Sequence, residues 1–248
     1  MTVTSRYKDA WEGFWSEVSG DEPGEVIWDA DPALTAGLHL ALYEPLVDAP
    51  GLPLLDLGCG NGTQTRYLAD RFPRVIGLDL SAAAIDLARA AVAAEAEPPS
   101  GEISFRRVDV VDKDAIAELH EELGDCNVYM RGVLHQADTK DRRPLVETIA
   151  VLIGARGRAF VFELAEAAGA RLAHLAQEPS GPPPKLQPVF KHGIVPGAVS
   201  DSDAVDLFEA AGLTVLAGGD LPLTTTEYEK DGSRIELPSK WSVVGRTG

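Results

Sequence analysis

A cluster of glycines stands between an apolar stretch and the start of a predicted helix. The apolar stretch runs from Leu54 to Leu57 and predicts a buried strand, and Gly58, Gly60 and Gly62 follow it. Because glycine lacks a β-carbon, a ligand can lie against the backbone of such a turn, and amides at the start of the next helix can face a polar or anionic group. The segment predicts a nucleotide-type site, although tight turns of this kind also occur without a ligand.

A carboxylate at the end of the next predicted strand supports the nucleotide interpretation. Residues 75–79 form a second apolar run that ends in Asp79. An acid at this point of an open α/β sheet can accept hydrogen bonds from both hydroxyls of a ribose. A dinucleotide fingerprint would place its third small residue at Thr63, whereas this chain has its glycine at Gly62. That spacing, together with the lack of a recognisable Tyr-x-x-x-Lys pair, disfavours a nicotinamide dehydrogenase.

An acid also precedes the glycine turn. The resulting pattern Asp-x-Gly-x-Gly-x-Gly over residues 56–62 resembles the first motif of class I S-adenosylmethionine-dependent methyltransferases. The order of predicted elements from Leu54 to Arg246 resembles the seven-stranded sheet of that family, so the likeness covers about four fifths of the chain. The resemblance implies a methyltransferase whose cofactor is S-adenosylmethionine.

The resemblance also implies cofactor contacts by position. It places the glycine turn near the methionine moiety, Asp79 on the ribose hydroxyls and Leu80 beside the adenine. Asp109 matches a position where a carboxylate accepts from the adenine amino group, and we favour this role over the alternative that the side chain solvates a loop or caps a helix. The residues that we assign to cofactor binding are Asp56, Gly58, Cys59, Gly60, Gly62, Asp79, Leu80, Asp109, Val110, Arg131 and Trp28.

The methyl acceptor is predicted to bind after the fourth strand, outside the carboxyl ends of the strands. His135 is the candidate catalytic residue there, because an imidazole titrates near neutrality and can remove a hydroxyl proton. Its position resembles that of the catalytic histidine of small-molecule O-methyltransferases, which usually have Asp next, where this chain has Gln136. Packing under a loop is the alternative for His135. The main chain of Arg131 is expected at the cofactor, which leaves its side chain for an acidic substrate or an internal carboxylate.

Two helices are predicted before the glycine turn, within an N-terminal helical cap over residues 1–50. The first carries one apolar stripe: Tyr7, Trp11, Phe14, Trp15 and Val18. The second follows Asp31 and carries a leucine stripe: Leu34, Leu38, Leu42 and Leu46. We expect Trp11 and Trp15 to bind an apolar substrate and Trp28 to offer a cation–π face to the sulfonium. Simple core packing is the alternative for all three.

The remaining elements alternate between strand and helix. Strands are predicted at 54–57, 75–79, 103–108, 127–130 and 158–163, with an antiparallel pair at 213–217 and 241–245; helices are predicted at 63–71, 81–95, 114–123, 142–153, 164–177 and 201–211. This order predicts an α/β fold with a Rossmann-like, mostly parallel, seven-stranded sheet and helices on both faces. Residues 51–248 are expected to form the methyltransferase domain, with a lid-like insertion near 165–200, as one structural unit with the cap.

The charge and the cysteine content of the chain limit the kinds of binding partner and compartment that we expect. The 22 basic and 39 acidic residues give a formal charge of −17, which disfavours nucleic acids and anionic membrane surfaces. Cys59 and Cys126 are the only cysteines, so neither a disulfide framework nor a zinc site is expected, and a reducing cytoplasm fits. No signal-peptide pattern or membrane-spanning apolar run is found in the sequence.

We hypothesise methyl transfer to a small organic molecule, with oxygen as the favoured acceptor atom. A nitrogen or carbon acceptor, a protein substrate and a non-catalytic cofactor-binding protein are the alternatives. The sequence leaves the oligomeric state open between a monomer and a homodimer.

Overall fold

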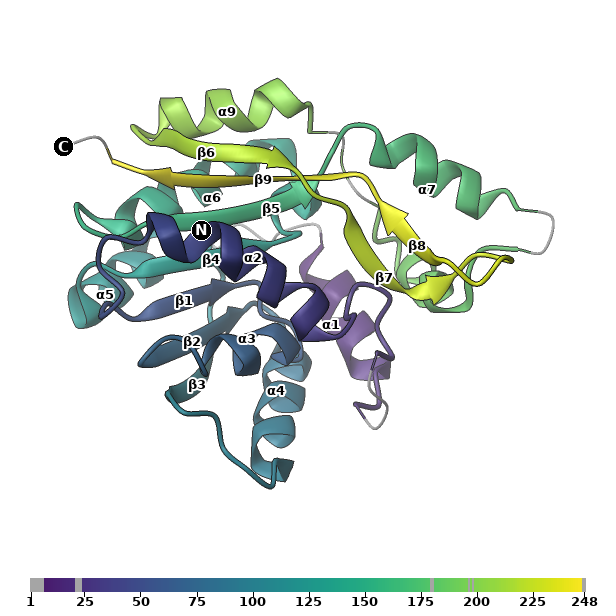
Figure 1. Ribbon diagram of the computed structural model, residues 1–248, viewed down its shortest axis with the longest axis horizontal. Coiled ribbons are helices and arrows are strands. Elements are labelled where there is room, and N and C mark those ends of the chain that lie inside the picture. Colours follow the sequence, from purple (N-terminus) through teal and green to yellow (C-terminus); the bar gives the residue numbers. More distant parts are fainter. Residues whose placement is uncertain (1–6, 21–23, 179–180, 196, 198, 247–248) are drawn as a thin grey trace.

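One seven-stranded sheet forms the centre of the computed structural model, which describes residues 7–20, 24–178, 181–195, 197 and 199–246 (Figure 1). Its strands are β1 (Leu54–Leu57), β2 (Arg74–Asp79), β3 (Glu102–Arg107), β4 (Asn127–Arg131), β5 (Ala159–Leu164), β6 (Thr214–Asp220) and β9 (Ser239–Gly245). They lie in the order β3-β2-β1-β4-β5-β9-β6. Strands β1 to β5 are parallel, and β9 is antiparallel to both of its neighbours.

Helices cover both faces of this sheet. One face packs against α2 (Ala36–Tyr43), α3 (Thr63–Leu68) and α4 (Ala82–Ala94), and the other against α5 (Lys113–Leu123), α6 (Thr139–Ile153) and α9 (Asp201–Ala210). Successive strand residues point to opposite faces, so Leu54 joins the first core and Leu55 the second. Both faces are buried, which is why the central strands are apolar runs instead of alternating patterns.

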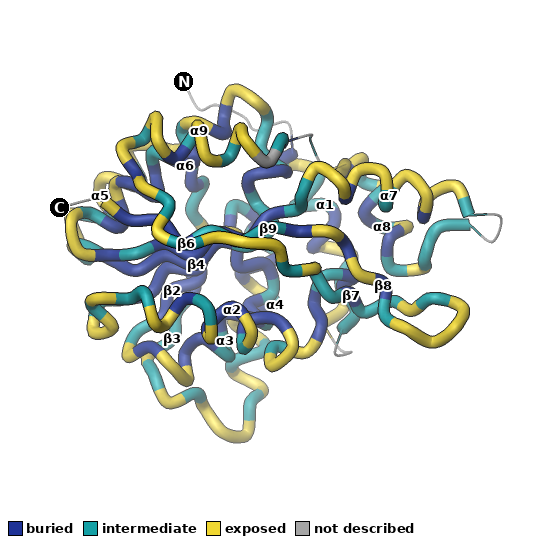
Figure 2. Tube along the Cα trace, turned by 45° about the horizontal axis from the view of Figure 1, so that its top comes forward, coloured by how far each residue is buried: buried dark blue, intermediate teal, exposed yellow. Residues whose placement is uncertain are grey.

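A second layer, here called the cap layer, lies beyond the carboxyl ends of the parallel strands (Figures 1 and 2). It contains α1 (Lys8–Glu17), α7 (Ala168–Ala176), the 3-10 turn η4 (Pro184–Leu186), α8 (Gln187–Lys191) and the hairpin of β7 (Leu223–Tyr228) and β8 (Arg234–Leu237). These elements share one apolar cluster that includes Phe14, Trp15, Leu175, Val189 and Ile235. Segments far apart in the sequence thus meet where the cofactor and acceptor were predicted to bind.

The predicted Rossmann-like architecture is confirmed, including the antiparallel strand near the sheet edge. The leucine stripe predicted before the glycine turn is only half confirmed, because Leu42 and Leu46 pack against the core whereas Leu34 and Leu38 are 46% and 48% exposed. The buried positions of α2 are Ala36, His39, Leu40 and Tyr43. The reason is that His39 pairs with the Tyr129 hydroxyl at 2.7 Å and lies against aromatic rings of the sheet, which turns a polar residue inward.

The hairpin and the segment near 165–200 differ in how far the sequence predicted them. The β7–β8 hairpin was not predicted, because β7 (Leu-Thr-Thr-Thr-Glu-Tyr) and β8 (Arg-Ile-Glu-Leu) are short, carry few apolar residues and are only partly buried. The segment near 165–200 contains α7, η4 and α8, its residues 179, 180, 196 and 198 lie outside the described residues, and its role as a lid stays a prediction. In the described part of the chain no helix combines the length and apolarity needed to cross a bilayer. The division into residues 1–50 and 51–248 stays a prediction.

Candidate active site

The glycine turn is tied to the second strand by its own backbone. Gly58 N and Cys59 N both donate to the carbonyl oxygen of Leu78, at 2.7 and 3.0 Å. The three glycines of the turn have φ angles of 72°, 55° and 75°, in the left-handed region that favours glycine. A β-carbon on Gly60 would lie 2.6 Å from the Trp15 ring. The turn therefore needs glycine both for its conformation and for its close packing against α1.

Asp79 closes the turn from the end of β2. Its Oδ2 accepts from Gly60 N and its Oδ1 accepts from Ser81 N, both at 2.9 Å. The side chain is buried, and this burial raises the pKa of its carboxyl above the usual range despite the three backbone amides that favour the charged form. Each carboxylate oxygen has a second lone pair, so the group can still accept from ribose hydroxyls in the adjoining pocket.

Asp56 lies before the turn, in the buried strand β1. Its Oδ2 accepts from the Thr65 hydroxyl at 2.6 Å. Burial raises the pKa of this carboxyl to about 6, and the hydrogen bond and the nearby Arg131 charge only partly oppose the shift. A positively charged ligand next to Asp56 would favour the ionised form.

These groups line a continuous pocket, here called the cofactor pocket. Its lining includes the sequence-predicted residues Asp56, Gly58, Cys59, Gly60, Asp79, Leu80, Val110, Arg131, Trp11, Trp15 and Trp28. Gly62 and Asp109 are not in this lining. Gly62 instead packs under Phe105, whose ring would lie 2.8 Å from an added β-carbon, and Asp109 Oδ1 accepts from Val111 N within its own loop. The structure therefore brings the predicted set together, with these two residues as the exceptions.

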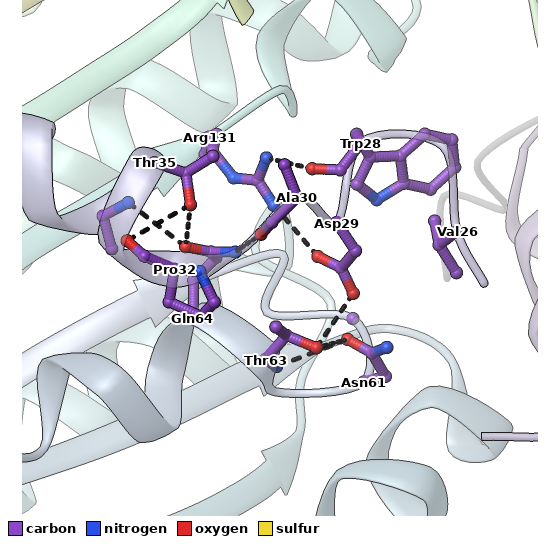
Figure 3. A network of polar contacts seen from close by, with 12 residues as sticks. Val26, Trp28, Asp29, Ala30, Pro32, Thr35, Asn61, Thr63, Gln64 and Arg131 are labelled. Atoms are coloured by element: carbon purple, nitrogen blue, oxygen red, sulfur yellow. Dashed lines mark hydrogen bonds and ion pairs between the residues drawn. The ribbon is translucent and has the colours of Figure 1, made fainter. Parts of the chain in front are cut away.

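The chain before α2 is anchored to the same pocket by a polar network (Figure 3). The Arg131 guanidinium donates to the Trp28 carbonyl oxygen at 2.7 Å and forms an ion pair with Asp29 at 3.3 Å. The other Asp29 oxygen accepts from the Thr63 hydroxyl at 2.9 Å, directly after the glycine turn. Of the two roles expected for this arginine side chain, the structure shows the internal carboxylate. Trp28 is thereby fixed at the pocket wall.

Helix α1 packs against the glycine turn through Trp15 and is also attached to the start of α4 through the carboxylate of Glu12. Glu12 accepts from the backbone amides of Ala82 and Ala83, at 2.8 and 3.3 Å, at the N-terminus of α4. This contact complements the partial positive charge of that helix end. It adds a polar anchor to α1, whose Trp11 and Trp15 side chains line the pocket.

A second pocket, here called the acceptor pocket, adjoins the first and shares Trp11, Trp28, Arg131 and Gln136 with it. Trp15, which was also predicted to bind the substrate, lines only the cofactor pocket. The cap layer supplies most of the other lining residues of the acceptor pocket, namely Leu172, Leu186, Val189, Phe190, Leu223, Thr225 and Leu237. The remaining ones are Ile27, Gly132, His135 and Leu164. A pocket with mainly apolar walls and few polar groups suits a small organic ligand.

His135 faces this acceptor pocket and is held by Glu163 from the end of β5. The two side chains meet at 2.6 Å through His135 Nδ1, and both are buried. Glu163 also accepts from the backbone amides of Val133, Leu134 and His135, at 3.0, 2.8 and 3.1 Å. Because an ionised carboxylate only accepts, the shared proton belongs on Nδ1, which leaves Nε2 as an acceptor.

Sequence reasoning did not single out Glu163, Glu12 or Asp29. For Glu163 the signal was present, because a carboxylate ends an apolar strand there in the same way as Asp79 does. The other two acids lie in irregular or helical segments, and only folding shows what they contact. No group of three or more side chains suited to hold a metal ion occurs among the described residues.

The strand order, the glycine turn and the two carboxylates at the ends of β1 and β2 together define a class I methyltransferase fold with a cofactor site. Comparison with known proteins gives the family. A model described as a methyltransferase domain matches residues 54–157. An S-adenosylmethionine-dependent methyltransferase from Anabaena variabilis is 32% identical, with 97% of this chain and 95% of that chain covered and a TM-score of 0.86.

The chain therefore belongs to the S-adenosylmethionine-dependent methyltransferases, and S-adenosylmethionine is its cofactor. Magnesium protoporphyrin IX methyltransferase from Synechocystis, solved with S-adenosylhomocysteine, is 18% identical over 96% of this chain and 93% of that chain, with a TM-score of 0.59. A putative methyltransferase from Haloferax volcanii, solved with a methyltransferase activator, is 17% identical over 96% and 98%, with a TM-score of 0.62. These two likenesses show the shared fold. A comparison with curated proteins gave no match.

Proposed function

We propose that this enzyme transfers the methyl group to an oxygen of a small organic molecule bound in the acceptor pocket, with His135 as general base. The observation that carries the proposal is the His135–Glu163 pair, because it presents an imidazole to a mainly apolar pocket next to the cofactor pocket. Asp79 would hold the ribose, Leu80 the adenine and the glycine turn the methionine moiety. When bound, S-adenosylmethionine supplies an electrophilic methyl group on a sulfonium.

The residues of this chain support the transfer in two ways. The first is alignment, since the shared wall of Trp11 and Trp28 fixes the junction of the two pockets, and alignment alone can supply much of a rate enhancement. The second is proton removal: the acceptor oxygen forms its bond to the methyl carbon, the carbon–sulfur electron pair stays on sulfur, and the hydroxyl proton passes to His135 Nε2. Glu163 keeps the ring in the required orientation as a positioning residue.

The surroundings of the site support a small-molecule substrate in the cytoplasm. Cys59 and Cys126 are both free and buried, which suits a reducing compartment. The acceptor pocket lies under the cap layer, which suits a compact molecule better than a protein chain. The expected oligomeric state remains a monomer or a homodimer.

The test is a transfer assay with methyl-labelled S-adenosylmethionine and three acceptor panels: small hydroxylated aromatics, small amines and basic peptides. We expect label in the hydroxylated aromatics, recovered in the organic extract. Label only in amines would move the acceptor atom to nitrogen, and label only in peptides would overturn the small-molecule proposal. Tight S-adenosylhomocysteine binding without any transfer would favour a non-catalytic role.

A further inference from the structure

The lining of the cofactor pocket carries more negative than positive charge. We propose that Asp56 makes this pocket prefer the positively charged sulfonium of S-adenosylmethionine over the uncharged thioether of the product, S-adenosylhomocysteine, so that the product is the weaker ligand. This preference concerns the cofactor alone and does not depend on which acceptor molecule is methylated.

Four charged side chains line the cofactor pocket, three acids and one base: Asp29, Asp56, Asp79 and Arg131. Arg131 forms an ion pair with Asp29 at 3.3 Å, and these side chains are only 10% and 5% exposed, so the two charges compensate each other. Asp79 accepts from backbone amides at both of its oxygens. Asp56 is therefore the acid of the pocket whose charge is least compensated.

Asp56 has one hydrogen-bond donor among the described residues, the Thr65 hydroxyl, which lies 2.6 Å from Oδ2. Its Oδ1 atom has no donor in that part of the chain and is not one of the fully buried unpaired atoms, while the residue itself lines the cofactor pocket. Burial deprives the carboxylate of hydration and raises its pKa to about 6. A cation in the pocket offsets part of that cost, so the ionised carboxylate and a cationic ligand stabilise each other.

The sheet places Asp56 on the side of the cofactor pocket that meets the acceptor pocket. Asp56 of β1 is in register with Tyr129 of the neighbouring strand β4, and Arg131 lies two residues farther along β4 on the same face. Arg131 lines both pockets. The methyl group has to reach the acceptor pocket for transfer, and it is bonded to the charged sulfur. We therefore expect the sulfonium on the side of the pocket where Asp56 lies.

The cofactor and its product differ in charge at the sulfur atom only. Both carry the same amino and carboxylate groups and the same adenosine, whereas the sulfonium becomes a thioether once the methyl group has left. Loss of a positive charge close to a buried carboxylate removes an attraction, so the transfer itself weakens the binding of the molecule that remains.

Isothermal titration calorimetry at pH 7 measures the affinities of S-adenosylmethionine, S-adenosylhomocysteine and sinefungin, in which a carbon with an ammonium group replaces the methylated sulfur. In the native enzyme both cationic ligands should bind about tenfold more tightly than S-adenosylhomocysteine, which is a modest share of the attraction between opposite charges in a site that excludes water. Asp56→Asn keeps the size of the side chain and removes its charge. It should bring both ratios to about one.

Asp109→Asn is the matched control, because it removes a carboxylate charge from a loop outside the lining of the cofactor pocket. It should leave both ratios unchanged. A contact of Asp109 with the adenine would not alter this expectation, since all three ligands contain the same adenine.

The pH dependence of binding tests the proposal in the native chain, without a variant. The other titratable or charged groups that influence Asp56 or respond to it lie on four segments, and they are Asp29, Cys59, Asp79, Tyr129 and Arg131. Because protonation removes the charge of Asp56, the preference for S-adenosylmethionine should fall from about tenfold at pH 7 to about twofold at pH 5. Between these values its binding should release about half a proton, seen as a binding heat that depends on the buffer. Asp56→Asn should show neither effect.

Equal binding of S-adenosylmethionine and S-adenosylhomocysteine by the native enzyme at pH 7 would overturn the proposal. A preference that persists in Asp56→Asn, or one that sinefungin does not share, would overturn it as well, because contacts of the methyl group would then be the cause. Binding is measured without an acceptor, so failure of the transfer assay with hydroxylated aromatics and failure of this proposal are distinguishable.

Discussion

Asp56 links the stability of the ligand-free enzyme to pH through its buried carboxyl. The pKa of this carboxyl is about 6 in the folded protein and 3.8 for an ordinary, solvent-exposed aspartate. The unfolded chain therefore loses this proton first as pH rises. A folded-state pKa that is raised means that stability falls between about pH 4 and pH 6 and is constant above that range. Across this pH range the free energy of unfolding falls by about 3 kcal/mol, at about 1.4 kcal/mol for each unit of pKa difference.

The variant Asp56→Asn removes this titration and should flatten that part of the pH profile. Denaturant unfolding at several pH values between 4 and 7 measures the effect, and Asp114→Asn, which changes an exposed carboxyl, is the control. If both variants shifted the profile equally, Asp56 would not be the group responsible. A bound sulfonium should favour the ionised carboxylate, so we expect the cofactor to stabilise the native enzyme more at pH 7 than at pH 5.

His135 and Glu163 give a second prediction at the scale of single residues. His135→Ala should lower kcat about a hundredfold, the usual loss for a general base, with little change in the KM for S-adenosylmethionine. Glu163→Gln should also lower kcat while changing the KM for S-adenosylmethionine much less, because Glu163 orients the imidazole and is not itself in the lining of the cofactor pocket. Steady-state kinetics on the identified acceptor separates the two parameters. An unchanged kcat in His135→Ala would leave alignment as the main source of catalysis.

The sequence predicts individual site residues only where a local pattern carries them. Asp79 and the turn glycines follow from the order strand, turn and helix, which fixes their place at the sheet edge. Glu163 ends a strand in the same way, but its role depends on a histidine 28 residues away in the chain. The pairing of Arg131 with Asp29 has no sequence signature at all, since only the folded chain shows which partner a charged side chain has.

At the scale of elements, Glu12 of α1 is a polar anchor that attaches this helix to the start of α4. Glu12→Gln removes the charge and weakens its hydrogen bonds to Ala82 and Ala83. A charge at a helix end contributes about 1 kcal/mol, so S-adenosylhomocysteine should bind about fivefold more weakly. Calorimetry measures the affinity. Asp9→Asn, an exposed acid on the same helix, is the matched control and should leave the affinity unchanged.

The elements that the sequence predicts well are those with one environment along their length. Strands β1, β2 and β4 are buried on both faces and appear as short apolar runs. The hairpin of β7 and β8 belongs to the thin cap layer, where one side meets the apolar cluster and the other meets solvent, and its pairing is irregular. The inward turn of His39 on α2 was hidden for a related reason, because its partner Tyr129 lies 90 residues away.

For the whole molecule, the two pockets divide the chain into segments that should respond to different ligands. The cofactor pocket is built from the N-terminal segment and from the ends of β1, β2 and β4. The acceptor pocket adds α7, η4, α8 and the β7–β8 hairpin, which the cofactor pocket does not contact. Two segments held together by a ligand exchange their amide hydrogens more slowly, because their local opening becomes less frequent.

Hydrogen exchange followed by mass spectrometry should therefore show two steps of protection. S-adenosylhomocysteine alone should slow exchange in α1 and the glycine turn and leave α7 and the β7–β8 hairpin unchanged. Addition of a hydroxylated aromatic acceptor identified by the transfer assay should then slow exchange in α7, α8 and the hairpin, as expected for the lid predicted near residues 165–200. Protection of the hairpin by S-adenosylhomocysteine alone would show that the cap layer closes on the cofactor, and the acceptor would then have to enter first or through a separate opening.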